Sequence, residues 1–312
     1  MKIFSDLNEF SAPGRGIFCT IGMFDGIHRG HQHVIQNTVD QAKRANGHAL
    51  IITFDPHPAR VVAPEHAPLM IYPPGKRRQL LAESGADFVW MIPFDQAFSR
   101  LTGQAFLELI CDRFKPLQSI CVGPDFHFGY QRSGNVNLLN QQSSLLQFDV
   151  PKIVPVTEGE QEISSTEIRK CVQSGELEQA ANLLGRPYEL SGSVVSGQKL
   201  GRKIGFPTAN LNVDKLVIPP NGVYPVRAQL NEATYNGVMN IGVRPTLENA
   251  SNPRLVEVHL FDCDQDFYGE TLTVQPLEMI RPERKFPSLD ALTGQIQIDC
   301  QEARTRLSSA AQ

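Results

Sequence analysis

Short apolar runs alternate with amphipathic stretches along the first half of the chain. The apolar runs have the length of buried strands, and they cover residues 16–22, 48–54, 87–92, 119–123 and 152–156. The stretches between them predict helices over residues 30–45, 76–84 and 103–113, and a further helix that begins near Ser165. Strands that alternate with helices are typical of α/β folds, so we expect a parallel sheet with helices on both faces.

The pattern changes after about residue 186, where strand-like runs follow one another without helices between them. The runs are separated by Gly, Pro and Asn, and they cover residues 188–197, 206–213, 222–230, 235–243, 254–262 and 270–280. Such spacing predicts a small antiparallel barrel or sandwich. A closing helix is expected over residues 288–306, with Leu289, Leu292, Ile296 and Ile298 as its apolar residues. We therefore predict an α/β domain over residues 1–184 and a β domain over residues 185–312.

Composition and charge narrow the functional class. The 312 residues carry a net charge of −4, which gives no global basic field, so we expect no nucleic-acid partner. We also expect no membrane association, because no apolar run approaches the roughly 18 residues of a membrane span and the first residues do not resemble a secretion signal. The six cysteines are scattered without a Cys-x-x-Cys pair, which favours reduced thiols in a cytoplasmic protein.

The stretch GMFDGIHRGH, residues 22–31, joins the first apolar run to the first predicted helix. A helix N-terminus presents free N–H groups and partial positive charge, which favour anions. His28 and His31 are three residues apart, so at a helix start they share a face and add donors for a polyphosphate. Two other interpretations stay open. One is a metal pair, which lacks the Glu of a His-Glu-x-x-His site; the other is turn glycines beside core histidines.

This stretch resembles the hallmark of the nucleotidyltransferase superfamily, His-x-Gly-His after the first strand, and in its longer form it resembles the bacterial flavin adenylyltransferases. Three further segments follow in that family's order: TFDPHP at residues 53–58, VGPDFHFGYQRSG at residues 122–134 and ISSTEIR at residues 163–169. Taken singly, each is also explained by local structure: a proline turn, a loop whose phenylalanines fill the core, and a common helix cap. The ordered set is more specific than any one segment.

The resemblance implies a Rossmann-like nucleotidyltransferase domain that transfers AMP from ATP to FMN and releases pyrophosphate. It implies that His28, His31 and Arg169 act on the leaving phosphates. The residues that it implies for ATP are Gly22, Phe24, Asp25, Gly26, Gly30, Ser164, Ser165 and Thr166. Those that it implies for the flavin are Phe54, His57, Pro58, Asp125 and Phe126. A phosphate monoester is already anionic at pH 7, so this reaction needs alignment and positive charge rather than a general base.

The second half contains GQKLGRKIGFPTAN, residues 197–210, which is rich in Gly, Lys and Arg. It is not a Walker loop, but its N–H groups and cationic side chains can wrap phosphate. Thr208 and Asn210 are two residues apart, so in a strand they share a face and offer oxygen ligands that suit magnesium. Glu257 becomes a general base if it faces a pocket rather than solvent. The alternative is a basic hairpin followed by a polar edge strand.

This half resembles the riboflavin kinases in GFPTAN, NIGVRPT, VEVHLFD and RPERKF, the last at residues 281–286. The resemblance implies a closed antiparallel barrel with a terminal helix. It implies Glu257 as the catalytic base, Thr208 and Asn210 as ligands of magnesium-ATP, and Arg281 and Glu283 beside the flavin. The loop residues that it implies for ATP are Gly197, Lys199, Gly201 and Lys203, with the contacting basic residue left open.

Nearly the whole chain thus resembles the bacterial bifunctional riboflavin kinases/FMN adenylyltransferases, or FAD synthetases. That resemblance implies that ATP and Mg²⁺ convert riboflavin to FMN, and that a second ATP converts FMN to FAD. Three other functions stay open: the same fold with one inactive half, a flavin-binding regulator without turnover, and an adenylyltransferase for another phosphorylated vitamin.

Overall fold

The computed structural model describes residues 1–11, 14–159, 161–196, 201, 204–243, 254–263, 265 and 267–309. Internal contacts divide the chain into two units. The first comprises Met1–Pro68 and Pro74–Ser165, and the second comprises Leu69–Pro73 and Thr166–Gln312. The domain boundary expected between residues 184 and 185 stays a prediction.

The first unit is built on a five-stranded parallel sheet in the order β1-β4-β3-β2-β5. Its strands are β1 (Lys2–Phe4), β2 (Ile17–Ile21), β3 (His48–Asp55), β4 (Phe88–Pro93) and β5 (Leu117–Cys121). All five residues of β2 are buried, as expected for a strand covered on both faces. The predicted parallel sheet is therefore confirmed. Strand β1 at its edge was not predicted, because three residues are too few to give an apolar run.

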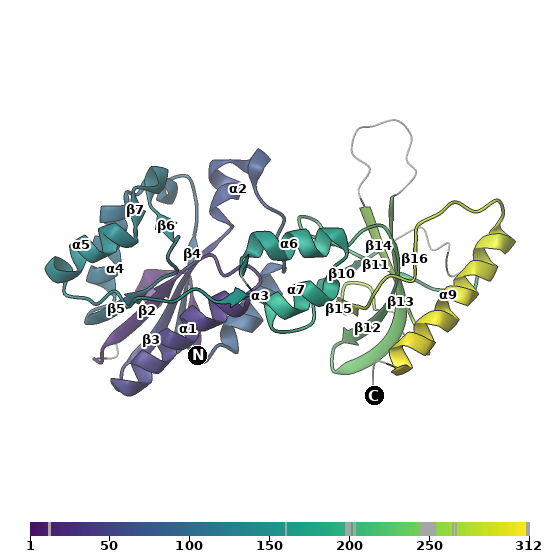
Figure 1. Ribbon diagram of the computed structural model, residues 1–312, viewed down its shortest axis with the longest axis horizontal. Helices are drawn as coiled ribbons and strands as arrows, with labels where there is room; N and C mark the ends of the chain where they lie inside the picture. The colour runs from purple at the N-terminus through teal and green to yellow at the C-terminus, as the bar shows by residue number, and fades with distance from the viewer. Residues whose placement is uncertain are drawn as a thin grey trace. The chain divides into compact units, whose positions relative to one another are not determined.

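Apolar side chains cover both faces of this sheet. One cluster joins alternate residues of β2 to α4 (Gly103–Arg113) and α5 (Val136–Leu146). The other cluster joins Phe18, which points to the opposite face, to α1 (Arg29–Arg44) and α3 (Pro74–Ala82). The predicted helical layers on both faces are confirmed (Figure 1).

Short elements connect the layers of the first unit. They are α2 (Pro58–Val62), the 3-10 helices Leu7–Glu9, Pro64–His66, Phe98–Arg100 and Tyr130–Arg132, and the paired strands β6 (His127–Phe128), β7 (Gly134–Asn135), β8 (Thr157–Glu158) and β9 (Gln161–Glu162). The strand expected over residues 152–156 is not formed. Pro155 in that run has no amide N–H to donate to a neighbouring strand.

The second unit contains a closed antiparallel barrel, in which each of six strands pairs with two neighbours in the order β13-β14-β11-β10-β15-β12 and back to β13. The strands are β10 (Leu190–Val195), β11 (Ala209–Leu211), β12 (Gly222–Leu230), β13 (Ala233–Val243), β14 (Arg254–Leu260) and β15 (Thr271–Pro276). The short strand β16 (Arg281–Pro282) also pairs with β12. The sequence left a barrel and a sandwich open, and the barrel is the fold found.

The described part of the second unit also contains α6 (Ser165–Ser174), α7 (Leu177–Leu184) and the terminal helix α9 (Leu289–Ser309), which contacts β12 and β13 (Figure 1). The terminal helix was predicted, but two of its expected apolar residues do not face the barrel. Leu289 is 56% exposed and Ile298 is 61% exposed, whereas Ala303 and Leu307 are buried against Val223 and Val238. Among the described residues, no helix is both long and apolar enough to cross a membrane.

Candidate active sites

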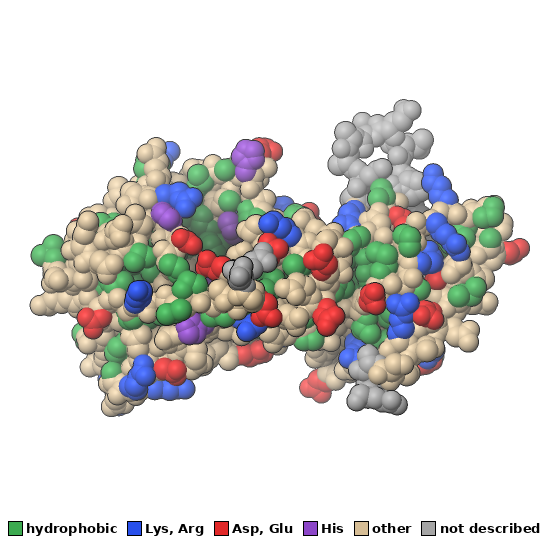
Figure 2. Space-filling view, viewed as in Figure 1, with side chains coloured by type: hydrophobic (Ala, Val, Ile, Leu, Met, Phe, Trp, Pro, Cys, Tyr) green, Lys and Arg blue, Asp and Glu red, His purple; other side chains and the backbone are tan. Residues whose placement is uncertain are grey.

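The first site lies where the order of the parallel strands reverses. The chain runs from β2 through α1 to β3 on one side of β2, while β5 pairs with the other side of β2. The loops that follow β2 and β5 therefore leave neighbouring strands at the same edge, where open α/β sheets bind ligands. Figure 2 shows a hollow in the surface of this unit with histidine and basic side chains around it.

His28 caps the helix that begins this site. Its Nδ1 accepts a hydrogen bond from the backbone N–H of His31 at 3.3 Å, which leaves the proton of a neutral His28 ring on Nε2. The two imidazoles stack with ring centroids 3.6 Å apart and an interplanar angle of 21°. His28 is 5% exposed, while His31 is half-buried. Both histidines thus lie at the N-terminus of α1, where partial positive charge favours a phosphate.

The turn before His28 has an uncommon backbone. Phe24, Gly26 and Ile27 all have positive φ, at 47°, 77° and 43°. For side chains other than glycine this region is disfavoured, and such conformations cluster at ligand-binding turns. The side chains of Phe24 and Asp25 are 2% and 1% exposed, so they support the turn from within. The ATP contacts expected at residues 22–26 stay predictions. Because the side chains of Phe24 and Asp25 are buried, we expect these two residues to contact ATP through backbone atoms.

The second nucleotide motif begins against the first. The hydroxyl of Ser165 donates to the backbone carbonyl of Asp25 at 2.9 Å. A Cβ at Gly30 would lie 3.1 Å from Nδ1 of His28 and 3.4 Å from the carbonyl oxygen of Ile163, so glycine leaves room for both. The structure therefore brings the starts of the two motifs together, although Asp25 and Ser165 are 140 residues apart in sequence.

From Thr166 onward that motif belongs to the second unit, whereas Ser164 and Ser165 belong to the first. Within the second unit, Nε of Arg169 donates to the backbone carbonyl of Leu69 at 2.6 Å. Ser164 is half-buried at the start of α6, and Thr166 is exposed. The roles expected for Ser164, Thr166 and Arg169 toward ATP stay predictions.

The residues expected beside the flavin occupy two loops of the first unit. Phe54 is 7% exposed and packs edge-on against Phe94, so its ring belongs to the core. His57 caps α2 by accepting from the N–H of Ala59 at 3.1 Å, and Pro58 is the first residue of that helix. In the loop after β5, Asp125 is exposed, and Phe126 stacks on Phe128 with centroids 5.5 Å apart. Their contact with a flavin stays a prediction.

Sequence reasoning missed a buried cation at this edge. Arg77 of α3 is 3% exposed, and its Nη2 donates to the backbone carbonyl of Phe54 at 2.7 Å. Burial lowers the pKa of Arg77, and the carboxylates of Asp55 and Asp25 oppose that change. Its hydrogen bond therefore ties α3 to the end of β3. The surrounding letters GKRRQLL show no clean apolar stripe, so periodicity gave no signal for a buried arginine.

The second site is a cavity of about 420 Å³ inside the second unit, between the barrel and α9. Its polar lining includes Thr208, Asn210, Asn240, Glu257 and His259. Its apolar lining includes Val223, Val238, Phe286, Leu292 and Ile296. The cavity thus combines an apolar part with a group of oxygen and nitrogen side chains, as ligand pockets generally do.

Glu257 lies in the middle of a polar row on the barrel. It is directly opposite Asn210 of β11 and directly opposite Asn240 of β13. Directly opposed residues of an antiparallel pair project to the same face, and all three line the cavity. The sequence left open whether Glu257 faces solvent or a pocket, and it lines the pocket. Asn240 was missed, although it shares the alternating pattern of β13 that places Val238 on the same face.

The glycine- and lysine-rich loop is only partly described. Gly201 lines the cavity, while Gly197, Lys199 and Lys203 lie outside the described residues. Just after this loop, Nδ1 of His259 lies 2.8 Å from the backbone carbonyl of Pro207, next to Thr208. The strand that carries Glu257 therefore also holds the backbone that presents Thr208.

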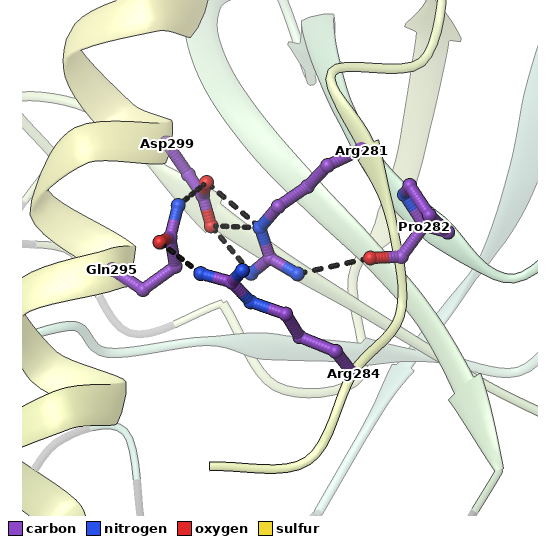
Figure 3. Close-up of polar contacts among 5 residues, drawn as sticks. All are labelled: Arg281, Pro282, Arg284, Gln295 and Asp299. Carbon is purple, nitrogen blue, oxygen red and sulfur yellow. Dashed lines mark hydrogen bonds and ion pairs between the residues drawn. The ribbon is translucent and has the colours of Figure 1, made fainter.

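The segment Arg281–Phe286 forms one wall of the cavity. Arg281 makes a bidentate ion pair with Asp299 of α9, with Nη2 2.7 Å from Oδ2 and Nε 2.9 Å from Oδ1 (Figure 3). On the other side, Oε2 of Glu283 accepts from Nδ2 of Asn221 at 3.1 Å. Asp299 was missed, yet it lies seven residues after Leu292, at a position where the buried stripe of α9 calls for an apolar side chain. A single charged residue within an apolar stripe was the sequence signal that could have indicated a functional role for Asp299.

The donor set suits a magnesium ion only together with phosphate. Among the described residues, no cluster of three or more His, Cys, Asp or Glu side chains could hold a metal ion. Thr208 and Asn210 line the same cavity and offer a hydroxyl and an amide oxygen, which are hard ligands. Magnesium commonly takes few protein ligands and completes its shell with phosphate and water, so these residues fit that ion.

Comparison with known proteins identifies both halves. A family model described as FAD synthetase matches residues 11–167, and one described as riboflavin kinase matches residues 184–307. A bifunctional riboflavin kinase/FMN adenylyltransferase from Escherichia coli K12 is 38% identical over 306 residues, which cover 97% of each chain. The chain belongs to the bifunctional riboflavin kinase/FMN adenylyltransferase family. The bifunctional riboflavin kinase/FMN adenylyltransferase of Haemophilus influenzae is 35% identical and covers 99% of this chain and 100% of its own.

A solved structure supports the fold at full length. The crystal structure of a protein from Streptococcus pneumoniae, named a macrolide-efflux protein, superposes with a TM-score of 0.81 at 30% identity and covers 96% of both chains. The family resemblance drawn from the sequence, and the α/β-plus-barrel fold that it implied, are confirmed.

Proposed function

We propose that this chain converts riboflavin to FMN in the cavity of the second unit, and FMN to FAD at the β2–β5 edge of the first. Each step consumes one ATP. The kinase step releases ADP, and the adenylyl transfer releases pyrophosphate. The scattered cysteines favour the cytoplasm as the place of action.

In the kinase step, Glu257 acts as the general base. Its carboxylate takes the proton of the terminal ribityl hydroxyl while that oxygen forms a bond to the γ-phosphorus of ATP and the bond to ADP breaks. A primary alcohol is a poor nucleophile until its proton is removed, so a positioned base speeds the step. Asn210 and Asn240, on either side of Glu257, orient the carboxylate and the hydroxyl.

Thr208 and Asn210 would hold Mg²⁺ together with the phosphates of ATP. When bound, this ion neutralises charge on the transferring phosphoryl group. The lysines of the loop 197–203 are proposed to contact the same phosphates.

In the adenylyl transfer, a phosphate oxygen of FMN attacks the α-phosphorus of ATP and pyrophosphate leaves. The nucleophile is already an anion, so the site must align it and stabilise the departing charge. The Nε2–H of His28, the imidazole of His31 and the N-terminus of α1 provide that stabilisation, and Arg169 adds a positive charge.

The observation that carries the proposal is the row Asn210–Glu257–Asn240 on the cavity wall. A general base needs to face a pocket beside hydrogen-bonding groups, and Glu257 meets that condition. In the first unit, the contact of Ser165 with Asp25 gives parallel support, because it joins the two nucleotide motifs.

The test is chromatography of flavins after purified protein is incubated with riboflavin, ATP and MgCl₂. We expect riboflavin to decline as FMN and then FAD appear. FMN without FAD, even when FMN is supplied, would mean an inactive first half. Riboflavin that stays unchanged while it binds the protein would mean a flavin-binding protein without turnover. If FMN accumulates without conversion to FAD and the protein adenylylates another phosphorylated vitamin, the substrate of the second reaction is not FMN.

A further inference from the structure

Asp299 is a buried carboxylate that the proposed chemistry does not use. It is 3% exposed and lies on the face of α9 that meets the barrel. Its oxygens accept three hydrogen bonds from Nε and Nη2 of Arg281, at 2.9, 3.1 and 2.7 Å. Nε2 of Gln295, one helical turn earlier, donates to the same carboxylate at 2.8 Å.

The same group reaches a second arginine. The oxygen of Gln295 accepts from Nη2 of Arg284, so Asp299 and Gln295 together hold two guanidinium groups of the segment Arg281–Phe286 (Figure 3). Both guanidiniums lie over the ring of Phe286, with centroid distances of 5.5 Å for Arg281 and 5.1 Å for Arg284. The plane of this aromatic ring is therefore fixed through α9.

Strand register connects this network to the catalytic row. Arg281 of β16 is opposite Val223 of β12, which is opposite Asn240 of β13, which is opposite Glu257. All four line the cavity. Three steps between strands, each about 4.8 Å, separate the Arg281 backbone from that of Glu257. The arginines and Phe286 thus mark the end of the cavity that is remote from the phosphoryl transfer.

The stability of the folded protein is a weak explanation for the buried ion pair between Arg281 and Asp299. A buried pair loses much of its attraction to desolvation, and a well-packed apolar pair is often as stable. Its geometry is directional, however, because a carboxylate that binds a guanidinium through two atoms fixes the plane of the guanidinium. A directional contact is useful where a planar ligand must enter between the barrel and a helix.

We propose that Asp299 is a positioning residue of the riboflavin site. It orients Arg281 directly and Arg284 through Gln295, and so sets the wall against which the flavin ring system lies. It acts on flavin binding and not on ATP or on proton removal. This inference rests on the proposed kinase function of the second unit.

The test compares Asp299→Asn with Asp262→Asn. Asn keeps the size of the side chain and removes the charge. The control removes another bidentate ion pair of α9, because both Oδ atoms of Asp262 lie 3.0 Å from Arg304. That pair is exposed, at 53% and 78%, and neither residue lines the cavity.

We expect Asp299→Asn to raise the KM for riboflavin about tenfold, a size that small misplacements of binding groups commonly produce. The KM for ATP and kcat should change less than about twofold, and conversion of supplied FMN to FAD should stay at the wild-type rate. Asp262→Asn should match the wild type in every measurement. Quenching of riboflavin fluorescence should show the same weakening without ATP.

An unchanged riboflavin KM in Asp299→Asn would overturn the proposal. Equal losses in riboflavin KM, ATP KM and kcat would also overturn it, because they indicate a structural role alone. If Asp299→Asn does not fold, Arg281→Lys keeps the charge but loses the bidentate geometry, and it should show the same selective rise. A wild-type protein that binds riboflavin but forms no FMN would refute the kinase function, while fluorescence titration would still test Asp299.

Discussion

Asn210 and Glu257 lie directly opposite each other in the antiparallel pairing of β11 with β14. Both side chains line the cavity of the second unit, so the expected magnesium ligand and the expected base share one wall. The strands are joined through backbone hydrogen bonds, which hold neighbouring strands about 4.8 Å apart. The separation of the two groups is therefore set by the sheet.

Replacing Glu257 with Gln tests the base. We expect the rate of FMN formation from riboflavin to fall by about 100-fold or more, because a positioned base commonly contributes that much. Gln has nearly the same size, so the barrel should keep its stability. FAD formation from supplied FMN serves as the internal control and should not change. A rate of FMN formation within threefold of the wild type would show that Glu257 is not the base.

The helix cap that His28 forms and the catalytic role proposed for it can be tested separately. Asn is among the best helix N-caps, so His28→Asn retains the cap of α1 and removes the imidazole. We expect its FAD formation to fall by about 100-fold while its free energy of unfolding stays within about 0.5 kcal/mol of the wild type. His28→Ala should show the same loss of activity and a further loss of about 1 kcal/mol in stability. If His28→Asn keeps full activity, the histidine acts as a cap alone.

Gly242 has no side chain, and the carboxylate of Glu283 occupies the space where a Cβ would lie. A Cβ at this position would lie 2.2 Å from Oε1 and 2.9 Å from Cδ of Glu283, so Gly242→Ala must displace that carboxylate from the cavity wall. We expect a riboflavin KM raised about fivefold and an unchanged rate of FAD formation from FMN. The matched control is Gly294→Ala on α9, where nothing lies within 4 Å of the new Cβ. That variant should gain up to about 1 kcal/mol of stability, since alanine is the better helix former.

We expect Tyr224 to make the stability of the barrel sensitive to alkaline pH. Burial raises the pKa of its hydroxyl to about 12, and that hydroxyl donates to the carbonyl of Pro220 at 2.7 Å. In the unfolded chain the pKa is about 10, so the unfolded state loses this proton first as pH rises. The contribution of Tyr224 is therefore complete below pH 10 and is lost between about pH 10 and 12.

Urea unfolding of the wild type and of Tyr224→Phe at several pH values measures this effect. Near pH 8 the variant should be about 1 kcal/mol less stable, because it lacks the hydrogen bond. Above pH 11 the difference should shrink or reverse by an amount on the order of 2 kcal/mol, since only the wild type has this group to ionise. Other groups titrate in both proteins and cancel in the comparison. A difference that does not change with pH would contradict the assignment.

Periodicity predicted the layers of both units well. The apolar runs at β2 and β3 and the amphipathic stretch at α1 follow patterns that burial imposes directly. Strand β1 gave no such signal because it has only three residues. The apolar run at residues 152–156 predicted a strand that is not formed. Pro155 lacks the backbone N–H that a strand donates to its neighbour, and apolar composition does not reveal this.

The sites were less accessible to sequence reasoning. His28 and Glu257 could be named, because histidine beside glycine and a carboxylate within an apolar strand depart from their surroundings. Asn240, Arg77 and Asp299 were missed. The alternation of β13 and the lone charge on α9 mark Asn240 and Asp299, but their significance depends on which strand or helix lies opposite. Pairing partners are set by tertiary structure and are not encoded in local pattern. On α9, Leu292 and Ile296 line the cavity, whereas Asp299 places a charge on the same face, at a position that the apolar stripe reserves for packing.

The closed ladder of the barrel has a consequence for how its sequence can vary. Loops outside the strands can lengthen or shorten without moving Glu257 relative to Asn210 and Asn240, since the three residues are tied through β11, β13 and β14. A single residue inserted within β14 ahead of Glu257 would turn this carboxylate away from the cavity and into the apolar interior of the barrel, where Val256 and Val258 now lie, because side chains alternate along a strand. The fold thus tolerates changes in loop length but does not tolerate the insertion of one residue within β14.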